Sequence, residues 1–271
     1  MNTEVSFAST GNAFTRGLSL EQIRNRAPAV FATSAHERTS ARYRFIRTEQ
    51  VLQGLMETGF VPVDARQIIS RSSLHGRHIV RLRRKYEEVQ LRDVIPEIVF
   101  LNSHDGSSSY QLRLGMFRAV CTNGLIVAQA AFPTFRIVHR RDVVDEAIAA
   151  ALQLAAKFES LAGVVEQMER RYLEPHEQTA LAEEGLRLRF GSLEQARLPA
   201  SQLLVARRVE DVGYDLWRTF NRVQENVLRG GQARRAVSGR LTRVRQISSI
   251  QEDLRLNDGL WERAQGLLQA A

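Results

Sequence analysis

Cysteine is almost missing from this chain of 271 residues, in which Cys121 stands alone. A single cysteine excludes an intrachain disulfide and argues against a zinc site built from thiolates. Nothing in the neighbouring sequence supplies the base or the helix N-terminus that would activate the thiol as a nucleophile. We therefore expect Cys121 to be a buried structural residue, and we predict a protein of the reducing cytoplasm.

Long hydrophobic runs and targeting signals are missing as well. Residues 1–17 have neither the apolar core nor the early basic cluster of a signal peptide. The longest apolar segment, residues 147–156, is shorter than the roughly 20 residues needed to cross a bilayer. The phosphate-loop patterns GxxxxGK[ST] and GxGxxG do not occur, which argues against a nucleotide-driven motor. We expect no membrane partner and no bound cofactor.

Lysine is scarce and arginine supplies nearly all of the positive charge, since Lys85 and Lys157 are the only lysines. The formal net charge is +8 and the sequence pI is about 10.4, which favours an anionic partner. The planar guanidinium suits bidentate contacts to phosphate and stacking on bases. Codon usage in a GC-rich genome would explain the choice of arginine over lysine, but it does not explain the net charge.

The first 140 residues have the pattern of a small antiparallel sheet with two helices. Ser19 and Gln22 have capping-box spacing at the start of a short helix, and Thr48 stands where it would cap a second helix that ends at Gly59. Pro62 places the first strand at an edge of the sheet. Strands are predicted near residues 60–63, 77–84, 95–101, 110–120 and 131–139.

The second half is helical. Residues 142–172 keep a helical period almost without interruption and predict one helix about 45 Å long. Further helices are predicted over residues 175–190, 199–209, 214–229 and 250–268. The fold class is therefore α+β, with a flexible N-terminal arm over residues 1–17, a sheet domain over 18–140 and a helical domain over 141–271.

A polar turn joins the two best-defined strands and consists of Asn102, Ser103, His104 and Asp105. The pair Asp105-Gly106 favours a plain hairpin tip, because both residues tolerate positive φ. A functional interpretation makes the turn a polar cluster that touches a ligand or a phosphate. A hydrolase would need His104 and Asp105 in a pocket with residues from other strands, such as Arg118 or His139. The sequence leaves these alternatives open, and we assign no catalytic residue.

The six histidines do not form a metal-binding pattern. No pair has the i, i+3 or i+4 spacing of a metal site on a predicted helix. His75 and His78 are three residues apart, but Gly76 and the strand-like sequence separate their faces. We expect no metal ion.

Basic residues gather in two places. The first group is Arg77, Arg81, Arg83 and Arg84, in or beside one predicted strand. The second is the window of residues 207–245, where ten arginines outnumber four carboxylates, so that the window carries six of the eight net charges. We expect its phosphate contacts to come from Arg234, Arg235, Arg240, Arg243 and Arg245.

Three aromatic residues precede the basic stretch of that window, at helical spacing. Tyr214, Trp217 and Phe220 could stack on bases, although their spacing is more typical of a helix that faces the core.

The stretch PEIVFLNSHDGSSSYQLRLGMFRAVCTNGLIV resembles the bacterial phage- and plasmid-borne proteins known as domain of unknown function 932. Two further stretches support the resemblance, APAVFATSAHERTSARYRFIRTEQVLQGLMETGF near the start and LNDGLWERAQGLL near the end. The resemblance implies occurrence on mobile elements and supplies no catalytic residue. The opening of the chain is also loosely similar to single-strand annealing recombinases of phage, which is an analogy of fold alone.

These observations favour a nucleic-acid-binding protein that acts in replication or recombination of a phage, plasmid or integrative element, with single-stranded DNA as the expected ligand. The first alternative is a protein-interaction module, such as a modulator of host defence, that uses the apolar faces of its helices and self-associates. It predicts an exposed apolar stripe on residues 142–172 without a continuous basic groove. The second alternative is an enzyme centred on His104 and Asp105.

Overall fold

The computed structural model describes residues 17–40, 43, 45–68, 74–85, 94–118, 124–126, 134–137, 143–234 and 241–270. The chain forms two compact units. The first unit comprises Met1–Glu87, Phe100–Tyr110 and Ile137–Ile148, and the second comprises Glu88–Val99, Gln111–Arg136 and Ala149–Ala271. The predicted domain boundary at residues 140–141 stays a prediction.

The sheet confirms the expected α+β class. Its strands lie in the order β1-β2-β3-β4-β5, β6 pairs with β4, and the described pairs β1–β2 and β4–β5 are antiparallel. Pro62 lies in the edge strand β1, as expected. The bounds are β1 (Phe60–Gln67), β2 (His78–Arg84), β3 (Val94–Asn102), β4 (Tyr110–Arg118), β5 (Gly124–Ile126) and β6 (Phe135–Ile137).

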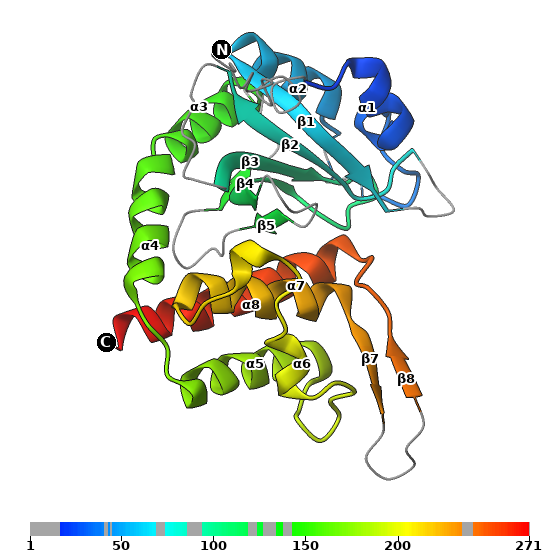
Figure 1. Cartoon of the computed structure of the whole chain (residues 1–271). Coiled ribbons are helices and arrows are strands. Elements are labelled where there is room, and N and C mark those ends of the chain that lie inside the picture. The colour runs from blue at the N-terminus through cyan, green and yellow to red at the C-terminus, as the bar shows by residue number, and fades with distance from the viewer. Residues whose placement is uncertain are drawn as a thin grey trace, which may run out of the picture. The chain divides into compact units, whose positions relative to one another are not determined.

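In the first unit, helices α1 (Leu20–Arg26) and α2 (Thr48–Glu57) both contact β1, with the short turn η2 (Pro28–Phe31) after α1 (Figure 1). The capping box of Ser19 and Gln22 is confirmed, since each residue's side chain accepts from the other's backbone N–H. The prediction that Thr48 caps α2 is wrong. The N-cap is Arg47, and the Thr48 hydroxyl is held by other side chains.

The long helix expected over residues 142–172 bends into two helices, α3 (Val143–Ala155) and α4 (Phe158–Arg170). At the bend the N–H of Lys157 donates to the carbonyl of Leu154, an i to i−3 bond that tightens the last turn of α3. Residues 143–170 are long and apolar enough to cross a membrane by length and composition. A single such stretch is weak evidence, because core helices meet the same criterion, and Leu154, Phe158 and Leu161 are buried here.

The second unit is built on three mutually contacting helices, α5 (Pro175–Phe190), α7 (Leu216–Arg229) and α8 (Ile250–Gln269). Trp217 and Phe220 of α7 and Trp261 of α8 form their aromatic core. The core interpretation of the aromatic spacing is therefore confirmed for Trp217 and Phe220, whereas Tyr214 is exposed. The helix predicted over residues 199–209 is wrong beyond its first turn. Only α6 (Ala200–Leu203) and the turn η3 (Val209–Asp211) form there.

The stretch expected as a loop after α7 begins and ends as an antiparallel hairpin, β7 (Gly231–Arg234) and β8 (Leu241–Val244). Figure 1 shows this hairpin extending from the helices of the second unit.

Candidate nucleic-acid interface

The end of α7 is shaped so that β8 lies directly against it. Gly230 has a φ of +71°, and a Cβ at this position would collide with the backbone carbonyl of Val244. Only glycine satisfies both the left-handed conformation and the close approach. As a result, Val244 and Arg245 lie beside the last turn of α7.

Two adjoining hollows flank β8 and share Arg243, Val244 and Arg245. One has a volume of about 740 Å³ and the other about 470 Å³. The charged residues that line them are all arginines. We call this surface the arginine groove and define it by Arg189, Arg197, Arg207, Arg229, Arg243 and Arg245.

Three of these arginines are fixed by the protein itself. Arg207 donates to the Asn226 side chain at 2.6 Å and to the Gly230 carbonyl at 3.1 Å. Arg229 pairs with the buried carboxylate of Glu225 at 3.0 Å. Arg189 donates to the carbonyls of Val227 and Arg245, and burial lowers the pKa of its guanidinium.

The other three, Arg197, Arg243 and Arg245, are exposed and form no ion pair within the described part of the chain. The groove therefore combines fixed guanidinium groups with exposed ones, and none of its lining residues is acidic. Such a surface attracts phosphate, because a cluster of like charges is stabilised when an anion enters.

Of the five arginines predicted in the second basic group, the structure brings Arg243 and Arg245 into the groove. Arg234 lies in β7, and Arg235 and Arg240 lie outside the described residues. Sequence reasoning missed Arg189 and Arg197 because they precede the basic window and meet β8 only in the folded chain, from the end of α5 and from the segment that follows it.

The arginines of the first basic group bind mainly to other residues of their own unit. Arg81 pairs with Asp64, its cross-strand partner on β1, at 3.4 Å, and Arg26 and Arg66 share the same carboxylate. Arg77 donates to the carbonyl of Ser107 at 2.7 Å. Arg83 and Arg84 are half-buried at the end of β2. Their predicted contacts to phosphate stay predictions.

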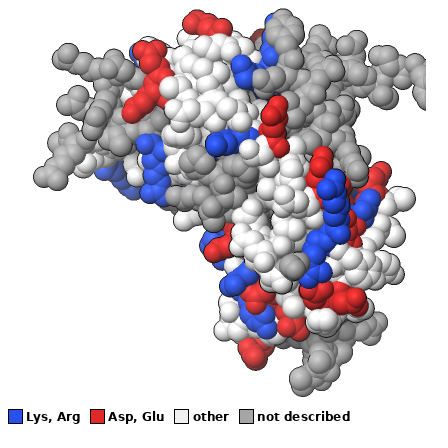
Figure 2. Space-filling view, turned by 90° about the vertical axis from the view of Figure 1, so that its left-hand side faces the viewer, with Lys and Arg blue, Asp and Glu red and all other residues white. Residues whose placement is uncertain are grey.

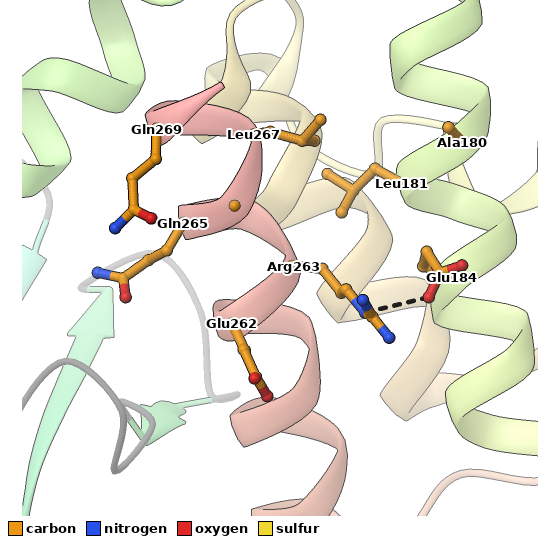
Figure 3. Close-up of a pocket in the computed structure, with 9 residues that line it drawn as sticks. Ala180, Leu181, Glu184, Glu262, Arg263, Gln265, Leu267 and Gln269 are labelled. Atoms are coloured by element: carbon orange, nitrogen blue, oxygen red, sulfur yellow. Dashed lines mark ion pairs between the residues drawn. The ribbon is translucent and has the colours of Figure 1, made fainter. Parts of the chain in front are cut away.

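A third hollow lies between α5 and α8 and differs in charge. Arg263 forms an ion pair with Glu184 at 3.1 Å, and Glu262 also lines the site. Figure 3 shows the Arg263 and Glu184 side chains pointing toward each other across it. Figure 2, which faces the side of Figure 1 on which α4 lies, shows basic and acidic side chains intermixed. Neither surface has the single sign of charge that the arginine groove has.

The polar turn singled out by its sequence begins with buried residues and ends in an exposed hairpin tip at Asp105, Gly106 and Ser107. Asn102, Ser103 and His104 are buried, and Asp105 is exposed. The turn is anchored by the Tyr43 hydroxyl, which donates to the carbonyl of Ser103 at 3.0 Å. Burial, with the charge of Asp105, raises the pKa of Tyr43 to about 12.

The Thr48 hydroxyl is the centre of the buried polar network beneath this turn. It lies 3.0 Å from His78 Nε2, 3.2 Å from His104 Nε2 and 3.3 Å from the Tyr110 hydroxyl, and it accepts from Asn102 Nδ2 at 2.9 Å. All five side chains are buried. Sequence reasoning missed this cluster because its members come from α2, β2, β3, β4 and the turn between β3 and β4.

The hydrogen-bond partners assign the protons in this network. His78 Nδ1 is 3.0 Å from the Gly76 carbonyl, which can only accept, so Nδ1 carries the proton of His78. His78 Nε2 is then an acceptor, so the Thr48 hydroxyl donates its one proton to it.

Both buried imidazoles are strongly biased toward the neutral form. Desolvation lowers the pKa of His78 to about 4, against a weaker opposing effect of the Gly76 carbonyl. Desolvation and the neighbouring His78 lower the pKa of His104 to about 3, while the Ala29 carbonyl opposes the shift. Within the described residues, His, Cys, Asp and Glu side chains form no group of three or more that could hold a metal ion.

The network resembles a nucleophile and its base, but its burial favours a structural role. The Thr48 hydroxyl and its imidazole partner are closed off from solvent, and His104 is buried whereas Asp105 is exposed. Catalysis through His104 and Asp105 would require both side chains to face one substrate. The residues considered as their partners, His139 and the side chain of Arg118, lie outside what the structure describes, as does Cys121.

The comparisons with known proteins agree on one family. Residues 35–261 match the model described as domain of unknown function (DUF932). The UPF0380 protein YfjQ of Escherichia coli (strain K12) is 40% identical over 256 residues, which cover 93% of this chain and 92% of the relative. The UPF0380 protein YafZ of the same organism is 38% identical over the same shares. No solved structure matches the chain.

Proposed function

This chain belongs to the DUF932 family, and because that description names no activity, we propose from the geometry that the protein binds nucleic acid through the arginine groove. The favoured ligand is single-stranded DNA. We propose that it acts in the cytoplasm, in replication or recombination of a phage, plasmid or integrative element, which is the context that the resemblance suggested.

One observation carries the proposal. Six arginines from five different parts of the chain line the hollows on either side of β8, and none of the other lining residues is acidic. Arginine forks match the geometry of phosphate oxygens, and neutralising several phosphates at once releases counterions. The fixed members of the groove lose little conformational freedom when a phosphate binds, because their side chains are already held.

The alternative of a protein-interaction module predicted an exposed apolar stripe on α3 and α4. Among the large apolar side chains described there, only Leu152 is exposed, at 38%. Because this stripe is not present in the described part of α3 and α4 while the arginine groove is positively charged, nucleic acid is favoured over this alternative.

The test is binding of a fluorescent single-stranded oligonucleotide to the triple variant Arg197→Gln, Arg243→Gln and Arg245→Gln. We expect at least a tenfold loss of affinity, because three phosphate contacts are removed. The matched control removes three charges from exposed, carboxylate-paired arginines by Arg170→Gln, Arg187→Gln and Arg263→Gln. Equal losses in both variants would mean that net charge alone drives binding, and the groove proposal would be wrong.

A further inference from the structure

The segment from Leu204 to Asp215 connects α6 to α7 with an unusual distribution of side chains. Several of its polar side chains bind to α7 or are buried. Arg207 and Arg208 reach Asn226 and Glu225 of α7 at 2.6 and 3.0 Å, and Asp211 is 1% exposed. These contacts hold the segment along the length of α7.

The apolar side chains of the same segment face outward. Val209 is 86% exposed, and Val205 and Val212 are also more than half exposed. A segment that is held by buried polar contacts and presents its apolar side chains to solvent leaves a hydrophobic surface without a covering element among the described residues. Surfaces of this kind mark binding sites. We call it the valine strip and define it by Val205, Val209 and Val212.

Two tyrosines lie next to one another where this segment reaches α7. Leu173 N–H donates to the carbonyl of Tyr214, and Leu216 N–H donates to that of Arg171, each at 2.8 Å. This short antiparallel pairing places the Tyr172 and Tyr214 rings 5.9 Å apart, inclined at 45°. The two side chains are 54% and 61% exposed, so the pair is fixed by the backbone while both rings stay accessible.

We propose that the Tyr172–Tyr214 pair, extended by the valine strip, is a platform on which unpaired bases stack while the phosphates of the same strand lie in the arginine groove. This inference rests on the proposed function and makes it more specific, because it selects single strands over duplexes. The bases of a duplex are stacked on each other and offer no free face, whereas aromatic side chains bind single strands by stacking.

Continuity with the groove favours nucleic acid as the occupant of this surface. Arg207 of this segment donates to Asn226 of α7 and also lines the groove. Tyr214 and Arg229 stand at opposite ends of α7, whose 14 residues span about 20 Å. An extended strand of a few nucleotides covers that distance. Arg218, half-exposed beside Tyr214, continues the positive charge toward the tyrosines, although it is paired with Asp215.

The experiment uses the full chain and a single-stranded oligonucleotide of about 12 nucleotides that carries 2-aminopurine, whose fluorescence is quenched when the base stacks. The variant Tyr172→Leu with Tyr214→Leu removes both rings. The matched control, Tyr172→Phe with Tyr214→Phe, keeps them. We expect the leucine variant to lose the quenching and roughly tenfold or more in affinity for the single strand, with unchanged duplex affinity and salt dependence. The phenylalanine variant should behave as the wild type.

Wild-type quenching and affinity in the leucine variant would overturn the inference. If the arginine triple variant still loses binding in that case, the proposed function survives and only the platform is wrong. If the leucine substitutions instead change the oligomeric state and leave the quenching intact, the surface is an interface between copies of the chain, and the inference also fails. Absence of wild-type binding to any oligonucleotide would remove the proposed function and this inference together.

Discussion

Arg207 Nε donates to Asn226 Oδ1 at 2.6 Å, and the same amide donates through Nδ2 to the carbonyls of Leu203 and Val205 at 3.0 and 2.9 Å. Asn226 is 3% exposed and lies in the last turns of α7. One buried amide therefore holds an arginine of the groove and the start of the segment that carries the valine strip. The two surfaces proposed to bind nucleic acid share this support.

Replacing Asn226 by leucine should damage stability and binding together. The change leaves Arg207 Nε and two carbonyl groups without their partner, and we expect a loss of about 2–5 kcal/mol in the free energy of unfolding. Urea unfolding and oligonucleotide affinity measure the two effects. Asn221→Leu is the control on the same helix, because the Asn221 amide donates to the Trp217 carbonyl and to no other group in the described residues, and we expect it to cost about 1 kcal/mol. Equal effects would contradict the role given to Asn226.

Replacing Gly230 by alanine should separate β8 from the end of α7. The new Cβ would meet the Val244 carbonyl, and the φ of +71° disfavours any residue with a Cβ. We expect a loss of more than about 1 kcal/mol in stability and a weaker single-strand affinity. Gly163→Ala is the control, because no atom lies within 4 Å of its added Cβ in helix α4. We expect that change to be neutral or to stabilise by up to about 1 kcal/mol.

Replacing Thr48 by valine should destabilise the first unit. The hydroxyl is the shared partner of buried His78, His104 and Asn102 groups, so its loss leaves several of them unsatisfied. We expect a cost of about 3–5 kcal/mol in unfolding free energy. Thr58→Val provides the comparison, because the Thr58 hydroxyl bonds only to helix carbonyls at an exposed position. A cost for Thr48→Val no larger than that of Thr58→Val would show that the network contributes little.

Stability should fall in mildly acidic solution because of the two buried imidazoles. Their pKa values, about 4 for His78 and about 3 for His104, lie below the value near 6.5 of an unfolded histidine. Below pH ~6.5 the unfolded state binds more protons than the folded state. The free energy of unfolding therefore decreases as the pH falls from ~6.5 toward ~4, by up to about 2.7 kcal/mol per pH unit for two groups. Above pH ~7 both states are neutral and this contribution is constant. Urea unfolding from about pH 5 to about pH 8 measures it, and a flat profile below pH ~6.5 would contradict the assignment.

The elements set by local patterns were predicted well from the sequence. The starts of the strands at residues 60 and 110, the Ser19 cap and the helix end at residue 229 depend on a few neighbouring residues, and the structure has them where the pattern indicates. The first strand runs four residues further than predicted. The errors arose where tertiary contacts outweigh local preference. Thr48 has the chemistry of a cap, but its hydroxyl bonds to histidines that are 30 and 56 residues away.

The candidate site was predictable only in part for the same reason. Clustered charge in the sequence identified Arg243 and Arg245. Nothing local indicates that Arg189 and Arg197 face them, or that Tyr172 meets Tyr214 across 42 residues of chain, since these pairs are made by the packing of α5 and by one short backbone pairing. Tyr214, Trp217 and Phe220 have helical spacing in the sequence, but the structure gives them different environments. Trp217 and Phe220 are buried, and Tyr214 is exposed.

The salt dependence of single-strand binding tests the central claim most directly. For single strands the slope of log affinity against log salt concentration is about −0.7 for each phosphate neutralised. The variant Arg197→Gln with Arg243→Gln and Arg245→Gln should therefore bind with a slope shallower than the wild type by about 2, while the charge-matched control at Arg170, Arg187 and Arg263 keeps the wild-type slope. Identical slopes for the wild type and the groove variant would show that the arginine groove does not contact the phosphates.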